Sequence, residues 1–160
     1  MRGPGLLRNH NDNNPLPTPK QATRPTPEMV APLRSQQRFQ NFKKVFLRLE
    51  KYGHQQSLNE LEEQGLIQSF EYTYELAWKT LQDILQERGH TEVAGPRPVI
   101  EQAFKDGLVQ DGEGWMRMFS DRNSASHIYD EQKAREILAN IRKEYVGLFR
   151  ALMGKLSPPY

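Results

Sequence analysis

The fold is decided by residues 57–89, whose sequence is SLNELEEQGLIQSFEYTYELAWKTLQDILQERG. Apolar side chains recur here every three or four residues, which is the spacing of one face of an α-helix. They are Leu58, Leu61, Phe70, Tyr74, Ala77, Trp78, Leu81, Ile84 and Leu85. Ser57 and Glu60 have capping-box spacing, and Gly89 is a common stop signal. We therefore predict one long helix here, in which Gly65 marks a bend or a close approach to another helix.

One helix is predicted before this stretch and three after it. The first covers residues 34–51 and ends at Gly53. The third follows a Gly-Pro-Arg-Pro turn at 95–98, where proline suits the first helical position, and it closes at Gly107. The residues assigned to the buried faces are Phe39, Phe42, Phe46 and Leu49 in the first helix and Val99, Ile100, Ala103 and Phe104 in the third.

The last two predicted helices flank residues 121–130. The fourth starts near Asp111, and the fifth runs from about Asp130 to about Met153 and ends at Gly154. Their apolar faces carry Trp115, Met118 and Phe119 in the fourth helix and Ile137, Ile141, Tyr145, Leu148 and Leu152 in the fifth. No alternating strand pattern is present, and the connections after residue 53 are short. The sequence therefore predicts an all-α fold, an up-and-down antiparallel bundle of about five helices.

Residues 1–33 differ in composition from the rest of the chain. Seven of the eleven prolines lie there: Pro4, Pro15, Pro17, Pro19, Pro25, Pro27 and Pro32. Because the segment has too few apolar residues for a core, we expect a disordered Pro-rich N-terminal tail. A docking segment is one interpretation, and an upstream extension or cloning remnant is the simpler one. The predicted domains are this tail, a helical bundle over 34–155 and a flexible C-terminal end over 156–160.

Composition narrows the class of protein. The chain has 160 residues and no cysteine, which excludes disulfides and thiolate chemistry. No apolar run approaches the length of a membrane span, and the N-terminus lacks the apolar core of a secretory signal, so we expect a cytoplasmic protein. The net charge of +2 comes entirely from residues 1–33, which leaves the bundle neutral. A neutral body does not indicate general nucleic-acid binding, so any contact with RNA is expected to be local.

Four basic residues cluster in the first predicted helix: Lys43, Lys44, Arg48 and Lys51. They are suited to phosphate contacts, although a solvated helix face is the more common explanation of such a cluster.

The second predicted helix carries Glu71, Glu75 and Lys79, each one helical turn from the next. Such a row is usually a ladder of i,i+4 ion pairs. Two carboxylates also suit metal binding or acid–base catalysis. However, no histidine lies at ligand spacing, so no metal site is predicted.

The chemically richest stretch is Asp121–Asp130, which lies between two predicted helices and is interpreted as a connection. It holds Arg122, His127 and Tyr129 within eight residues. Arg122 follows Trp115 by seven residues, so it projects from the same helix face. An arginine there is also explained as a structural charge at a helix C-terminus. Residue types alone favour a capped loop with a half-buried histidine and tyrosine.

Arginine and histidine together also suffice for cleaving RNA without a metal. Histidine activates the ribose 2′-hydroxyl or protonates the leaving oxygen, and arginine stabilises charge on the phosphoryl group. Two histidines, one from each subunit of a dimer, would serve as base and acid. The product would be a 2′,3′-cyclic phosphate.

The spacing of Arg122, His127 and Tyr129 matches the Arg-x4-His-x-Tyr motif of HEPN-fold proteins, which are small, helical and usually dimeric. Asn123, directly after the arginine, is also typical of that motif. The chain further resembles one HEPN branch at residues 38–42 (RFQNF), residues 70–79 (FEYTYELAWK) and Trp115. This branch is the nucleotidyltransferase substrate-binding protein family, related to the HEPN toxins of modules with a minimal nucleotidyltransferase. The resemblance covers roughly residues 34–155.

This resemblance implies a bundle like the C-terminal domain of kanamycin nucleotidyltransferase, a homodimer, and a minimal nucleotidyltransferase as partner. It implies that Arg122 and His127 are catalytic in a metal-independent ribonuclease, that Asn123 orders the motif, and that Tyr129 accepts AMP from the partner, which silences the toxin. No cofactor is implied.

The resemblance also makes Glu71, Glu75, Lys79 and Trp115 candidates for substrate contact. The alternative function is a non-catalytic subunit that presents a substrate or nucleotide to the partner nucleotidyltransferase. Ser35 departs from the family pattern, since many members carry an aromatic residue there.

Overall fold

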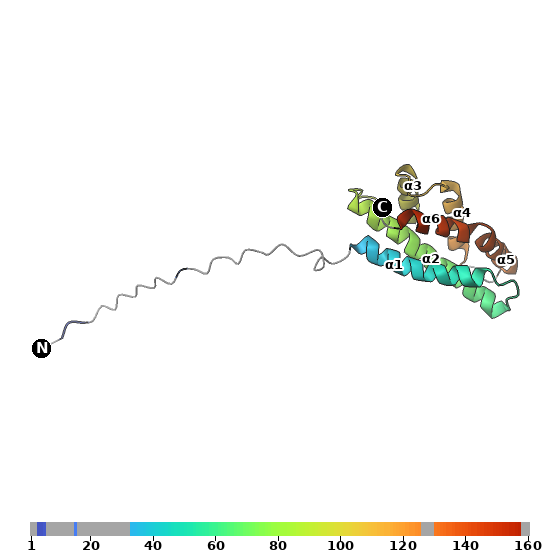
Figure 1. The fold of residues 1–160 in the computed structure, drawn as a ribbon, viewed down its shortest axis with the longest axis horizontal. Helices are drawn as coiled ribbons and strands as arrows, with labels where there is room; N and C mark the ends of the chain where they lie inside the picture. Colours follow the sequence, from blue (N-terminus) through green and yellow to red (C-terminus); the bar gives the residue numbers. More distant parts are fainter. Residues whose placement is uncertain (1–2, 6–14, 16–32, 126–129, 158–160) are drawn as a thin grey trace. The chain divides into compact units, whose positions relative to one another are not determined.

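The computed structural model describes residues 3–5, 15, 33–125 and 130–157, and the chain divides into two units, Met1–Ala31 and Pro32–Tyr160. All the helices belong to the second unit (Figure 1). They are α1 (Arg34–Gly53), α2 (Glu60–Glu87), α3 (Pro96–Lys105), α4 (Gly112–Ser124), α5 (Glu131–Asn140), the π-helical segment η3 (Ile141–Tyr145) and α6 (Val146–Leu156). The described residues contain no strand, and the all-α prediction is confirmed. Of the predicted tail, only residues 3–5, 15 and 33 lie within the described residues.

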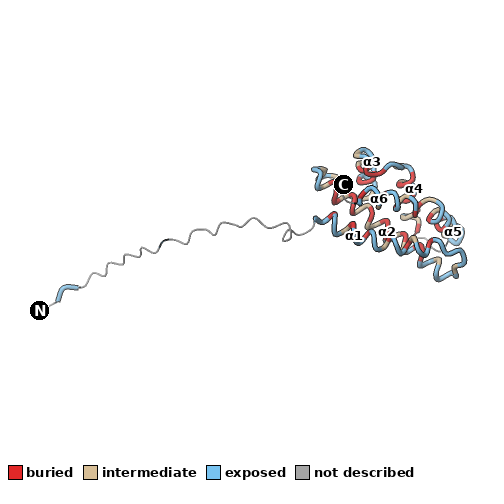
Figure 2. The backbone as a smooth tube through the Cα atoms, in the orientation of Figure 1, coloured by how far each residue is buried: buried red, intermediate tan, exposed pale blue. Residues whose placement is uncertain are grey.

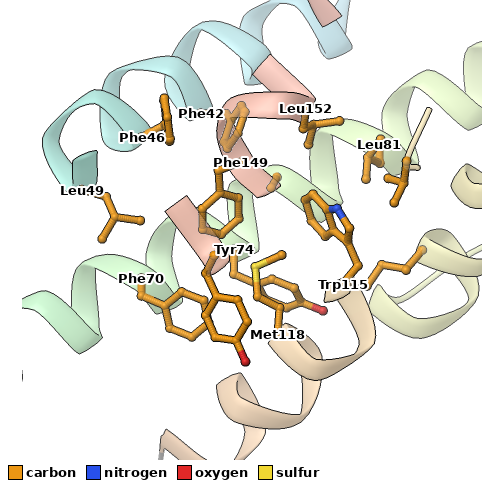
Figure 3. Packing of buried hydrophobic residues seen from close by; sticks show 14 of the residues in the cluster. Phe42, Phe46, Leu49, Phe70, Tyr74, Leu81, Trp115, Met118, Phe149 and Leu152 are labelled. Carbon is orange, nitrogen blue, oxygen red and sulfur yellow. The ribbon is translucent and has the colours of Figure 1, made fainter. Parts of the chain in front are cut away.

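The core lies where α1, α2, α4 and α6 meet. Helix α1 packs along α2 and against α6, while α4 contacts both α2 and α3. Phe42 of α1 meets Phe149 of α6 edge-on at 6.0 Å, and Trp115 of α4 meets the same ring at 5.8 Å (Figure 3). The buried residues line the sides of the helices that face one another (Figure 2). The predicted apolar stripes therefore explain how α4 is positioned against α2.

Two predicted core residues lie on the surface. Leu61 is exposed because it precedes Phe70 by nine residues, two and a half helical turns, and so points to the opposite side of α2. Phe104 lies at the edge of the buried face of α3 and covers Gly112, whose Cβ position is 3.2 Å from its ring. Gly65 has no neighbour within 4 Å of its Cβ position, so it marks no close approach.

Helix boundaries differ from the predictions in two places. Helix α2 is capped by Asn59 rather than Ser57: the Asn59 side chain accepts from the Glu62 N–H at 2.8 Å, and the Asn59 N–H donates to the Glu62 carboxylate at 3.2 Å. Gly154 does not end the last helix, because Leu156 is buried and holds another half-turn against the core.

The predicted fifth helix contains a π-helical turn. Ile137, Ile141, Tyr145 and Phe149 are all buried and are spaced by four residues, and in a regular α-helix each such step rotates the stripe by about 40°. The wider turn of η3, closed by the Val146 N–H bonding to the Ile141 carbonyl, takes up this rotation. As a result Phe149 is fully buried, and Leu148, predicted on the core face, is only half-buried.

Candidate active site

Arg122 lies in the last turn of α4 and not in a connection. Asp111 caps the start of this helix by accepting from the Gly114 N–H at 2.9 Å, and the buried Met118 holds the helix on the core. The interpretation of 121–130 as a connection is therefore wrong for Asp121–Ser124, which are helical. The predicted phase with Trp115 is confirmed, because Arg122 faces α2 and is about one-third exposed.

Arg122 pairs with Glu75 on α2. Its Nε donates to the Glu75 carboxylate at 3.3 Å, and both side chains are about one-third exposed. Lys79 lies one turn further along α2, with its Nζ 3.7 Å from the other Glu75 oxygen. The structure thus brings together Arg122, Glu75 and Lys79. A bond through Nε fixes the plane of the guanidinium and leaves a fixed cation at the end of α4.

Glu71 belongs to the same cluster. Burial raises the pKa of its carboxyl above the usual value, and the nearby Glu75 adds to the rise, while Arg122 opposes it. Two carboxylates therefore share one arginine, and the resulting cluster combines both signs of charge on the seam between α2 and α4.

Asp121, which the sequence analysis did not select, anchors the end of α4. Its buried carboxylate accepts from the Tyr145 hydroxyl at 2.5 Å and from the Asn140 amide at 2.9 Å, and it lies 3.3 Å from the Lys133 ammonium. These donors come from α5 and η3, on the far side of residues 126–129 in the chain. The signal for Asp121 is its position three residues after Met118, which places an acid in phase with a core stripe.

Burial and the bond to Asp121 raise the pKa of the Tyr145 hydroxyl far above its ordinary value, so the phenol stays neutral and donates. Tyr74 is the contrasting case: its pKa is raised by burial, yet its oxygen has no hydrogen-bond partner among the described residues.

The other predicted site residues are divided. Asn123 lies beside Arg122 and is exposed, whereas Trp115 is 2% exposed and packs in the core, away from the charged cluster. His127 and Tyr129 lie outside the described residues.

A groove of about 880 Å³ runs between α3 and α4. Phe104 and Met116 give it an apolar floor, while Glu101, Glu113 and Arg117 contribute charge. Arg122 does not line this groove, so the groove and the Arg122 cluster are separate features.

Within the described ranges, no helix is both long and apolar enough to cross a bilayer. Across the same ranges, His, Asp and Glu side chains form no group of three arranged to hold a metal ion.

Comparison with known proteins gives consistent relatives. Residues 37–158 match the family model described as nucleotidyltransferase substrate binding protein like. A probable ribonuclease HepT of Haemophilus influenzae is 35% identical over 81 residues, which are 48% of this chain and 56% of that protein. The chain therefore matches little more than half the length of this curated relative.

Two solved structures share the fold. A crystal structure of a Thermus thermophilus protein aligns with a TM-score of 0.68 at 31% identity, covering 72% of this chain and 98% of that one. A Haemophilus influenzae protein, described as having the fold of a nucleotidyltransferase substrate-binding domain, aligns with a TM-score of 0.58 at 24% identity. That alignment covers 76% of this chain and 95% of the other, and it supports the fold alone. The family match spans most of the helical bundle, and the chain belongs to the nucleotidyltransferase substrate-binding protein-like family.

Proposed function

We propose that this chain is the HEPN-type subunit of a two-protein module with a minimal nucleotidyltransferase, and that it is a metal-independent endoribonuclease in the cytoplasm. The observation that carries the proposal is the Arg122–Glu75 pair at 3.3 Å, which holds a partly exposed arginine at the end of α4, five residues before His127 in the chain. The curated relative named as a probable ribonuclease adds support from its own description.

The proposed reaction is transesterification at an RNA phosphodiester. The ribose 2′-oxygen attacks phosphorus, the new P–O2′ bond forms, and the P–O5′ bond breaks. One His127 takes the proton of the 2′-hydroxyl, and the His127 of the second subunit gives a proton to the leaving 5′-oxygen. Arg122 stabilises the charge that develops on the phosphoryl oxygens.

Glu75 positions the arginine in this scheme. Arg122 is a long side chain with several rotamers, and the contact through Nε restricts them before substrate binds. Glu75→Gln keeps a hydrogen-bond acceptor but removes the charge, so we expect a moderate loss of cleavage, smaller than the loss caused by removing Arg122.

Regulation by the partner is the second part of the proposal. We assign Tyr129 as the acceptor of AMP from the minimal nucleotidyltransferase, and Asn123 as the residue that orders the motif. AMP transfer forms a bond between the tyrosine oxygen and the α-phosphorus of ATP and releases pyrophosphate. Two subunits of a homodimer would each carry one such tyrosine.

A second candidate function is a substrate-binding subunit without catalysis. The groove between α3 and α4 favours it, because its volume of about 880 Å³ and its mixed apolar and charged lining suit a small ligand. In that case the groove would present the ligand to the partner's active site. The four residues that the resemblance makes candidates for substrate contact do not line this groove; they are Glu71, Glu75, Lys79 and Trp115.

The test is expression of the chain without a partner, in wild-type form and as His127→Ala, Arg122→Gln and Arg150→Gln. Arg150 is the matched control, because its guanidinium pairs with Glu50 across two helices at 2.7 Å, far from the motif in the sequence. We expect wild type and Arg150→Gln to arrest growth and leave 2′,3′-cyclic phosphate ends on RNA, while the other two variants do neither. Intact RNA with every variant would reject the ribonuclease and favour the substrate-binding subunit.

The modification is tested separately with purified partner and labelled ATP. Tyr129→Phe is expected to keep ribonuclease activity and to accept no AMP. Continued labelling of Tyr129→Phe would show that the acceptor is a different residue.

A further inference from the structure

The outer face of α1 carries a row of cations. Lys44, Leu47, Arg48 and Lys51 recur at helical spacing and are all exposed, on the side opposite the buried phenylalanines of that helix. We call these four residues the α1 basic stripe. It covers about two turns of helix, or roughly 10 Å along the axis.

Charge is distributed unevenly in the bundle. Helix α1 has six basic residues and one acidic residue, Glu50, a net charge of +5. Since residues 34–160 sum to zero, residues 54–160 carry a net charge of −5. The neutral average of the bundle therefore conceals one strongly basic helix.

The fold itself uses the other charges of α1. Arg38 reaches across to the buried Asp83 at 2.6 Å, and Glu50 receives Arg150 at 2.7 Å. The cations of the α1 basic stripe lie within 4.0 Å of no carboxylate among the described residues. The stripe is thus left over after the interhelical ion pairs have formed.

Solvated helix faces elsewhere in this protein look different. Arg97 pairs with Glu101 at 3.4 Å, and Lys79 with Glu75 at 3.7 Å, each at i,i+4 spacing. In the stripe, the same spacing joins Lys44 to Arg48, two like charges that repel and weaken the helix. An arrangement that costs the isolated helix stability is explained by a polyanion that offsets the repulsion.

We propose that the α1 basic stripe binds the phosphate backbone of single-stranded RNA. This proposal rests on the proposed function, in which RNA is the substrate. Leu47, 47% exposed in the middle of the stripe, and Tyr52, 43% exposed on its flank, offer apolar surface to unstacked bases. A strand held there would be presented to the protein by backbone contacts that do not depend on base sequence.

An anionic membrane is a less suitable ligand for this stripe. A helix that lies on a bilayer inserts an apolar face into the lipid, and the apolar face of α1 is buried in the core. Leu47 alone does not provide such a face.

Binding is measured by the fluorescence anisotropy of a labelled 2′-O-methyl RNA oligonucleotide, about 20 nucleotides long, which exceeds the usual site of a single-strand binding surface. This oligonucleotide lacks the attacking hydroxyl, so binding is observed whether or not the protein cleaves RNA. The stripe variant is Lys44→Gln, Arg48→Gln and Lys51→Gln together. The matched control is Lys105→Gln, Lys143→Gln and Lys155→Gln, which removes three exposed cations that lie on three different elements.

We expect the wild type and the control to bind with similar salt dependence. The slope of log K against log salt should be less steep by about 2 in the stripe variant, since each lost phosphate contact of a single strand changes it by about 0.7. Equal losses in both triple variants, or binding of anionic vesicles or an acidic peptide but not of the oligonucleotide, would overturn the proposal. Stripe-dependent binding without cleavage of unmodified RNA would support the stripe while rejecting the ribonuclease.

Discussion

Two buried tyrosines provide a controlled test of the bond between Tyr145 and Asp121. Tyr145 stacks on Phe70 at 5.2 Å and donates its hydroxyl to Asp121 at 2.5 Å. Tyr74 packs against the same phenylalanine at 6.4 Å, is equally buried, and has no hydrogen-bond partner among the described residues. Replacing each tyrosine with phenylalanine keeps the ring and removes only the oxygen.

Tyr145→Phe leaves the buried Asp121 carboxylate with only two of its three donors. Hydrogen bonds to charged groups contribute about 1.5–3 kcal/mol, so we expect the free energy of unfolding to fall by about 2 kcal/mol. For a bundle of this size that lowers Tm by roughly 8 °C. Tyr74→Phe removes a buried hydroxyl that makes no bond, and its stability should lie within about 0.5 kcal/mol of wild type or above it.

The assay is urea unfolding at pH 7, with Tm as a second measure. Both phenols have raised pKa values, so both are neutral at that pH and the comparison isolates the hydrogen bond. A raised pKa gives stability that is complete below the unfolded value of about 10 and is lost as the pH rises through the folded value. We therefore expect the alkaline loss of stability to be smaller in Tyr145→Phe. Equal stabilities for the two variants at pH 7 would refute the reasoning.

Two further predictions concern α4 and its neighbours. Gly114→Ala would place a methyl group 2.6 Å from the Asp111 carboxylate that caps α4, so we expect a loss of about 1–2 kcal/mol in urea unfolding. Gly147→Ala, at an open helical position, should instead stabilise by about 0.5–1 kcal/mol, and a loss there would contradict the packing described. Because the pKa of Glu71 is raised, mainly by burial, wild type should lose stability relative to Glu71→Gln as pH rises from about 4 to about 7. A pH-independent difference between those two proteins would exclude that cause.

Periodicity was sufficient for the fold because each helix has one strong apolar stripe. The predicted stripes of α1 and α4 are buried or half-buried, and the all-helical bundle follows from them. Leu61 was misassigned because an apolar residue near a helix start was counted without testing its phase against Phe70. Leu148 was misassigned because no α-helical period includes a π turn.

The site was only partly predictable. The phase of Arg122 with Trp115 correctly placed it on the seam with α2, but its partner Glu75 lies 47 residues away. Local patterns do not reveal which of the two carboxylates on α2 faces α4, because that depends on how the helices pack. Asp121 was missed for the same reason, since its three donors come from segments beyond residues 126–129.

The π turn at Ile141–Tyr145 makes chain length matter in an unusual place. A surface loop tolerates a deleted residue by shortening, but here the loss of one exposed residue such as Lys143 would remove the wide turn and keep a continuous helix. Everything after the deletion would then rotate by about 100° relative to α5. Phe149 would turn off the core and its neighbours would replace it. This segment therefore acts as a phase setting between two halves of one helix, and a family member without the extra residue must have a different apolar pattern in its final turns.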